Sequence, residues 1–169
     1  MSSTPPIVIL TEVDRPAIQA HLLRLSSDDR RLRFFCTISD DGVRHYASTI
    51  LDFKTTTVFG AFRGKDLIGM ACLAKATSTS AEAAFSIDAN ERGTGLAREL
   101  MRAVIRRGRE LKLQKLCMSC LRYNTKMQAL AVSFGLDLKL DFYEAYAELG
   151  FPAGYKLQTA SVPAMTEGV

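Results

Sequence analysis

The sequence lacks a long apolar run. No segment approaches the ~20 apolar residues that a membrane-spanning helix needs, so we expect no membrane partner. The start, MSSTPPIVIL, has no basic residues before its short apolar run, which is not the pattern of a secretory signal. We therefore expect a cytoplasmic protein.

A block of like charges is also missing. The net charge is +4, and the basic residues alternate with acidic ones. This balance fits either an anionic small ligand or an ordinary solvated surface. Binding of RNA or DNA would need an exposed basic patch with stacking aromatics, whereas Phe34, Phe35 and Tyr46 are expected to be buried. We expect no nucleic-acid partner.

Cysteine is sparse. The four cysteines all lie in apolar surroundings: Cys36, Cys72, Cys117 and Cys120. Cys117 and Cys120 form a C-x-x-C pattern, but KLCMSCL reads as a strand, in which positions three apart point to opposite faces. We therefore predict buried, reduced thiols and no metal site.

The pattern of elements predicts an α+β fold. The length of 169 residues suits one domain, expected over 1–158, with a flexible tail over 159–169. An apolar run over 6–10 predicts a first strand, and Pro16, Ser26 or Ser27, and Ser39 mark helix starts. Three β-rich runs follow, TTTVFGAFRG, DLIGMACLAKA and STSAEAAFSID, and predict consecutive antiparallel strands.

The second half alternates helices and strands. A helix is expected from the stretch RGTGLA to about Lys112, then the strand KLCMSCL, then a helix over NTKMQALAVSF that ends at Gly135. LDLKLD and EAYAEL alternate apolar and polar residues and predict two more strands, although a helix remains an alternative for EAYAEL.

The stretch DANERGTGLA, residues 88–97, is typical of an anion-binding turn. Its glycines come just before a helix, whose first N–H groups are unpaired and carry partial positive charge. No phosphate-loop pattern G-x-x-x-x-G-K-[ST] and no G-x-G-x-x-G are present. The antiparallel strands before the turn also differ from a dinucleotide-binding β-α-β unit.

This stretch resembles the cofactor loop of the GNAT superfamily of acetyl-CoA-dependent N-acyltransferases, [Q/R]-x-x-G-x-[G/A]. A second block of that family, N-x-x-[A/M]-x-x-L-x-x-x-x-G-[F/L], is matched by Asn124, Met127, Leu130, Gly135 and Leu136. The resemblance implies a mostly antiparallel central sheet flanked by helices, acetyl-CoA as cosubstrate and N-acetyltransferase activity. The finer pattern is closest to the acetyltransferase modules of bacterial protein-lysine acetyltransferases, through the run DRRLRF and a Glu ten residues before Arg92.

The resemblance also implies roles for single residues. Main-chain N–H groups would hold the pyrophosphate of CoA along Arg92, Gly93, Thr94, Gly95, Leu96 and Ala97. Phe85 and Ile87 would pair through their main chain with the pantetheine arm, and Asn124 would hydrogen-bond the cofactor. Arg98 or Arg102 would meet the 3′-phosphate, with a solvated helix face as the alternative.

Glu82 is the candidate general base, with a solvent-facing charge as the alternative. Many members place a Tyr, which protonates the leaving thiolate, where this chain has Ala131. Tyr123, Tyr143, Tyr146 or water would have to replace it. His21 and His45 are expected to be structural or surface residues.

The sequence leaves the acceptor open among a small amine, an amino acid and a protein lysine. It also leaves open the oligomeric state, with a homodimer as one candidate. The competing hypothesis is a catalytically weak acyl-CoA-binding regulatory module, which the missing Tyr favours and which Glu82 and the intact loop oppose.

Overall fold

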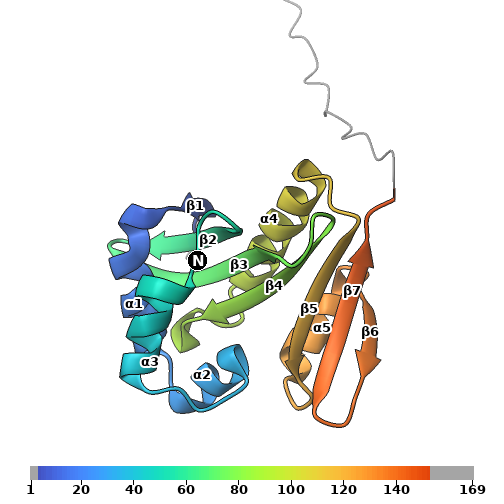
Figure 1. Ribbon diagram of the computed structural model, residues 1–169. Coiled ribbons are helices and arrows are strands. Elements are labelled where there is room, and N and C mark those ends of the chain that lie inside the picture. The colour runs from blue at the N-terminus through green and yellow to red at the C-terminus, as the bar shows by residue number, and fades with distance from the viewer. Residues whose placement is uncertain (1–3, 153–169) are drawn as a thin grey trace, which may run out of the picture.

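The computed structural model describes residues 4–152 and shows a seven-stranded sheet with helices on both faces (Figure 1). The strand order is β1-β2-β3-β4-β5-β7-β6, and every neighbouring pair is antiparallel except β4 and β5. The mixed, mostly antiparallel sheet expected from the sequence is therefore confirmed. The proposed tail over 159–169 lies outside the described residues, as does the end of the proposed domain.

The elements follow the expected order. The strands are β1 (Val8–Leu10), β2 (Thr56–Arg63), β3 (Asp66–Lys75), β4 (Ser80–Ile87), β5 (Lys115–Leu121), β6 (Asp137–Leu140) and β7 (Glu144–Gly150). The helices are α1 (Arg15–Arg24), α2 (Ser27–Phe34), α3 (Asp40–His45), α4 (Leu96–Glu110) and α5 (Thr125–Ser133). Short helical turns are η1 (Glu12–Asp14), η2 (Tyr46–Ile50) and η3 (Ala89–Glu91). EAYAEL is a strand, because it pairs with both β5 and β6.

Helix ends lie where the capping residues predicted them. The Ser26 hydroxyl accepts a hydrogen bond from the Asp29 N–H at the start of α2, and Ser39 does the same for Gly42 at the start of α3. Pro16 lies in the first turn of α1, where its missing N–H costs nothing. Gly135 follows α5 with φ 80, a left-handed conformation that favours glycine.

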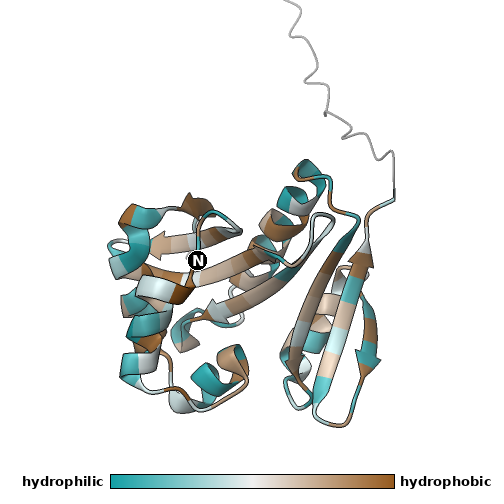
Figure 2. Ribbon diagram, viewed as in Figure 1, coloured by the Kyte–Doolittle hydropathy of each residue, from teal (hydrophilic) through white to brown (hydrophobic). Residues whose placement is uncertain are grey.

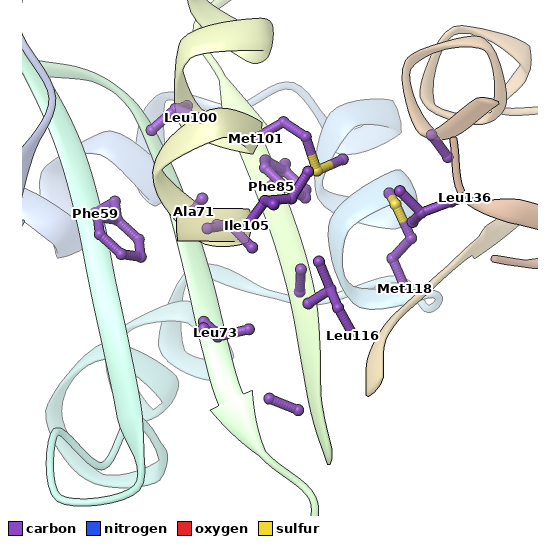
Figure 3. Close-up of a cluster of buried hydrophobic side chains, with 14 of the residues drawn as sticks. Phe59, Ala71, Leu73, Phe85, Leu100, Met101, Ile105, Leu116, Met118 and Leu136 are labelled. Atoms are coloured by element: carbon purple, nitrogen blue, oxygen red, sulfur yellow. The ribbon is translucent and has the colours of Figure 1, made fainter. Parts of the chain in front are cut away.

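Two apolar clusters hold the layers together, one on each face of the sheet. The larger joins α4 and α5 to the central strands and includes Leu100, Met101, Phe85 and Met118 (Figure 3). The other packs α1 and α3 against β2 and β3. Figure 2 shows hydrophobic residues along the central strands and hydrophilic ones on the outward helix faces. In residues 4–152, no helix combines the length and apolarity needed to cross a membrane.

The cysteine expectation is partly wrong. Cys72 and Cys120 are buried, but Cys117 is half-buried and Cys36 is exposed. Cys36 follows Phe35, whose left-handed backbone (φ 65) ends α2 and turns the chain outward. Phe35 is itself exposed, against the expectation that it is buried. No group of three or more metal-ligating side chains is present within the described residues.

The sheet is divided between β4 and β5. These parallel strands pair only at Ser80 with Lys115, Ala81 with Leu116 and Glu82 with Cys117. Beyond that point β4 continues to Ile87 and β5 to Leu121, but the two strands no longer pair with each other. Figure 1 shows them diverging. The parting leaves main-chain hydrogen-bonding groups at the centre of the sheet without strand partners.

We expect Leu100→Ala to lower the free energy of unfolding by about 2–5 kcal/mol, because Leu100 is fully buried between α4 and the sheet. The matched control is Arg106→Ala on the exposed side of the same helix, which should change stability by less than about 0.5 kcal/mol. Urea unfolding of both variants measures this. Equal losses would contradict the assignment of the buried face of α4.

Candidate active site

A cleft of about 770 Å³ opens where β4 and β5 part. Its walls come from both strands, from α2, from the turn before α4 and from the start of α5. The residues predicted for cofactor binding that line it are Phe85, Ile87, Arg92, Gly93, Gly95, Leu96, Ala97, Arg98 and Asn124. One cavity thus brings together segments that lie far apart in the sequence, from Leu25 to Ser133.

The edge of β4 that faces the cleft carries unpaired main-chain groups. The Asp88 N–H donates to the Ile68 carbonyl at 2.9 Å, so at this position the backbone points toward β3. Alternate residues of a strand point their N–H and C=O groups to opposite edges, so those of Phe85 and Ile87 point away from β3. Because β5 has parted from β4 here, these groups face the gap.

The turn before α4 exposes main-chain N–H groups. Gly93 and Gly95 have φ values of 75 and 89, and Gly95 is the N-cap of α4. A Cβ on Gly93 would meet no atom within 4 Å, so the backbone conformation, rather than packing, requires glycine there. The first N–H groups of a helix, here those of Leu96 and Ala97, have no carbonyl one turn back and are available to an anion.

Ion pairs attach this turn to the rest of the fold. The guanidinium of Arg92 bonds to the Asp29 carboxylate on α2, and Glu91 pairs with Arg63 of β2 at 2.8 Å. The Thr94 hydroxyl donates to the Glu91 carbonyl at 2.7 Å. The side chain of Arg92 is thus engaged, and its main-chain N–H makes a long hydrogen bond of 3.4 Å to the Ala89 carbonyl.

The opposite wall carries Arg98 and Asn124. Arg98 donates from Nη1 to Ser133 Oγ at 3.0 Å and packs over the Phe134 ring, so its guanidinium bridges α4 and α5 beside the cleft. Arg102 pairs with Glu99 and does not line this cleft. Asn124 caps α5 through its Oδ1, which accepts from the Met127 N–H at 3.3 Å. Within residues 4–152, its side-chain NH2 makes no hydrogen bond.

Glu82 lies at the vertex where the strands part. It is exposed and is the last residue of β4 that pairs with β5. By strand alternation its side chain shares a face of β4 with Ala84 and Ser86, which we call the open face. Ala84 and Ser86 line the cleft, whereas Glu82 lies one pleat short of it.

The residue at the position of the family's usual Tyr lies away from the cleft. Ala131 is 1% exposed and belongs to the apolar cluster under α5. Tyr123 lines the cleft, whereas Tyr143 does not. Tyr146 donates its hydroxyl to Cys117 Sγ at 2.9 Å, beside the vertex, and this hydrogen bond raises the pKa of the Tyr146 hydroxyl.

Sequence reasoning missed a buried polar triad that reaches the cleft. His21 Nε2 lies 2.9 Å from Ser86 Oγ, and His21 Nδ1 lies 2.9 Å from Asp88 Oδ1. His21 is fully buried and Ser86 is 8% exposed. Partial burial of Asp88 acts to raise its pKa, but its contacts with His21 and Arg24 outweigh that effect, and the pKa is lowered.

A sequence signal for the triad existed. His21 lies between Ile18 and Leu22 on the buried stripe of α1, where a polar side chain needs a partner. Ser86 follows Glu82 and Ala84 at strand spacing and so shares their face. The expectation that His21 is structural is compatible with its burial, but did not include its contact with a cleft residue. His45 lies at the end of α3 and is exposed.

Comparison with known proteins now adds to this geometry. The model of the acetyltransferase (GNAT) family matches residues 22–136. The chain belongs to this family. Members are acetyltransferases that use acetyl-CoA, and this chain is one of them. No curated protein sequence matches the chain.

Solved structures of low identity share the fold of this GNAT protein. The GNAT domain of S. lividans PAT has a TM-score of 0.73 at 21% identity, covering 86% of this chain and 89% of that one. Ribosomal-protein-alanine N-acetyltransferase from Brucella melitensis has a TM-score of 0.67 at 20% identity, with 86% and 99% covered. The yncA protein from Salmonella typhimurium, solved with its cofactor acetyl-CoA, has a TM-score of 0.64 at 13% identity, with 89% and 96% covered.

We expect Asp88→Asn to lower the free energy of unfolding at pH 7 by about 1–2 kcal/mol, since charged hydrogen bonds contribute that order and Asp88 is partly exposed. A lowered pKa in the folded protein stabilises above the ordinary value of 3.8, and this contribution is lost as pH falls through the folded value. The difference between variant and wild type should therefore shrink below about pH 3.8.

Urea unfolding between pH 7 and pH 3 measures this difference. The control is Asp66→Asn, an exposed carboxylate at the start of β3, which should have little effect at any pH. A difference for Asp88→Asn that persists unchanged to pH 3 would show that the carboxylate charge is not what stabilises the fold.

Proposed function

We propose that this protein transfers the acetyl group of acetyl-CoA to an amine by direct attack of the amine on the thioester. The observation that carries the proposal is the combination, in one cleft, of an unpaired edge of β4 and the free N–H groups of the turn before α4. The first can pair with an extended amide-containing chain and the second with a pyrophosphate, and CoA contains both.

The cofactor would lie across the parted strands. Its pyrophosphate would accept hydrogen bonds from the main chain of residues 92–97, and its pantetheine arm would run along Phe85 and Ile87. Asn124 would donate its side-chain NH2 from the opposite wall. Arg98 would meet the 3′-phosphate, since its guanidinium lies beside the cleft and contacts only the neutral Ser133 and Phe134 side chains there.

The chemistry needs a base on the acceptor side. The amine must lose a proton, its lone pair attacks the thioester carbonyl, and the C–S bond breaks to release the thiolate. A main-chain N–H at Phe85 or Ile87 would stabilise the oxyanion. Glu82 is the proposed base, because it is an exposed carboxylate on the open face of β4 without a side-chain partner among residues 4–152.

The buried triad offers a second route for the proton. In the tautomer that places the ring proton on Nδ1, 2.9 Å from Asp88 Oδ1, the His21 ring would accept the Ser86 hydroxyl proton at Nε2. Ser86 Oγ could then take a proton from an amine in the cleft. Ser86 is closer to the cleft than Glu82 but is held by His21, whereas Glu82 is free to move.

The proposed acetyl transfer leaves the chemical class of the acceptor amine open. One structural relative is named a ribosomal-protein-alanine N-acetyltransferase, which makes a protein amine one candidate acceptor, and a small amine is another. The alternative function, a regulatory module that binds acyl-CoA without turnover, keeps the same cofactor site. A turnover assay over a panel of amines, with release of the CoA thiol as the signal, separates the two.

We further propose a cytoplasmic protein with one domain over residues 1–158.

Acetyl-CoA should stabilise the protein by about 2.7 kcal/mol at a concentration 100 times its dissociation constant. Gly95→Val should abolish this gain, because a side chain there would crowd the pyrophosphate site. Gly135→Val is the matched control, since Gly135 has a similar φ of 80 but does not line the cleft. Backbone strain should lower the stability of Gly135→Val without ligand, but acetyl-CoA should still stabilise this variant as it does wild type. Thermal unfolding with and without acetyl-CoA measures this stabilisation. An unchanged stabilisation of Gly95→Val by acetyl-CoA would refute the cofactor site.

Glu82→Gln should lower turnover by ~10²–10⁴-fold while acetyl-CoA binding is retained, and the deficit should shrink as rising pH leaves more of the amine neutral. Ser86→Ala should lower turnover only a few-fold if Glu82 is the base. The measurement is the pH–rate profile of both variants on any accepted amine. A large loss in Ser86→Ala, with little in Glu82→Gln, would instead assign proton removal to Ser86 and His21.

A further inference from the structure

Arg33, in the last turn of α2, is a cation at the cleft wall without a negatively charged partner. Its Nη2 donates to the Tyr46 hydroxyl at 3.0 Å and lies 3.8 Å from Cys72 Sγ. Its guanidinium packs over the rings of Phe34 and Tyr46, with centroids at 5.0 and 5.6 Å. No carboxylate in residues 4–152 forms an ion pair with it.

The surroundings do not compensate this charge. Burial raises the pKa of Tyr46 to about 12, so its hydroxyl is neutral at physiological pH. The Nε of Arg33 is buried and has no hydrogen-bond partner. By contrast, Arg30 on the same helix pairs with Asp40 at 2.7 Å. A half-buried guanidinium without a counter-ion is incompletely compensated, so the position is well suited to an anion that enters the cleft.

The geometry places this anion on the acceptor side rather than on CoA. Arg33 contacts Cys72 of β3, which pairs with Ala84 of β4, so the guanidinium lies over the open face that also carries Glu82. The pyrophosphate turn contacts α2 through Asp29, one helical turn before Arg33. Asp29, which binds the turn before α4, and Arg33 therefore lie on successive turns of one helix.

We propose that Arg33 binds a carboxylate of the acceptor, so that the substrate carries an amine and a carboxylate in one molecule. The inference rests on the proposed acetyl transfer and adds the class of acceptor. Nη2 and Nε are committed or buried, which leaves Nη1 to donate to a single carboxylate oxygen. The carboxylate belongs to a free amino acid or to an acidic residue beside an amine in a peptide.

The test compares matched acceptors. Free amino acids, their carboxamides, and lysine peptides with and without a neighbouring Asp are assayed for acetylation by wild type, Arg33→Gln and Arg33→Lys. In wild type the carboxylate-bearing member of a pair should have a kcat/KM ~10–100-fold higher than its neutral partner. Arg33→Gln should remove this preference without slowing the neutral member, and Arg33→Lys should restore part of it. The free or peptide pair that shows the preference identifies the source of the carboxylate.

Arg31→Gln is the control, because Arg31 is an exposed residue of the same helix that does not line the cleft. It should keep the wild-type preference. Equal kcat/KM values for acid and amide in wild type, or an equal loss on both in Arg33→Gln, would overturn the proposal while leaving acetyl transfer intact. Absence of transfer to every amine would instead refute the proposed function.

A binding measurement keeps the inference testable if turnover is absent or Arg33→Gln does not fold. N-acetyl amino acids, acetyl-lysine peptides with a neighbouring Asp, and the matching carboxamides, which mimic the products, are titrated into wild-type protein saturated with CoA. The acids should raise the melting temperature and the amides should not. Equal shifts, or no shift with any acid, would overturn the role of Arg33.

Discussion

The parting of β4 and β5 beyond Glu82 and Cys117 is the constraint on which the site depends. Two parallel strands that stop pairing lose main-chain hydrogen bonds, so the packing around them must hold them apart. On one side Phe85 and Met118, from the two parted strands, belong to the same apolar cluster beneath α4 and α5 (Figure 3). On the other side α2 contacts both strands. Where main-chain pairing between β4 and β5 ends, side-chain packing therefore holds the two parts of the sheet together.

Ion pairs from three elements meet on the segment between β4 and α4. Asp88 contacts His21 and Arg24 of α1, Glu91 pairs with Arg63 of β2, and Arg92 pairs with Asp29 of α2. The two glycines that follow have left-handed backbones and add flexibility to the unfolded chain. In the folded protein, ion pairs at both ends of η3 hold the segment that precedes these glycines in place.

The sequence predicted the features that depend on local signals. Ser26 and Ser39 marked helix starts, and Gly93 and Gly95 marked a turn before a helix, because capping and backbone conformation are decided within a few residues. Long-range contacts were not predictable in the same way. Ser86 contacts His21, which is 65 positions away in the sequence, and the residues around neither one indicate this contact.

The exposure of Cys36 was also beyond the sequence pattern, since it depends on Phe35 adopting a conformation that a large side chain rarely takes. Arg33 looked like one more basic residue in an amphipathic helix. Its enclosure follows only from the packing of α2 against Tyr46 and Cys72. The candidate cofactor residues were therefore accessible from the sequence, whereas the candidate acceptor residues required the assembled fold.

The divided sheet has a consequence for the protein without its cofactor. An unpaired strand edge is a template onto which another chain can add a strand, and most proteins confine such edges to the outside of a sheet. Here the edge of β4 at Phe85 and Ile87 is internal, and α2 contacts both β4 and β5. Cofactor that pairs with this edge would occupy the template, so the cofactor-free protein would be the form more prone to self-association.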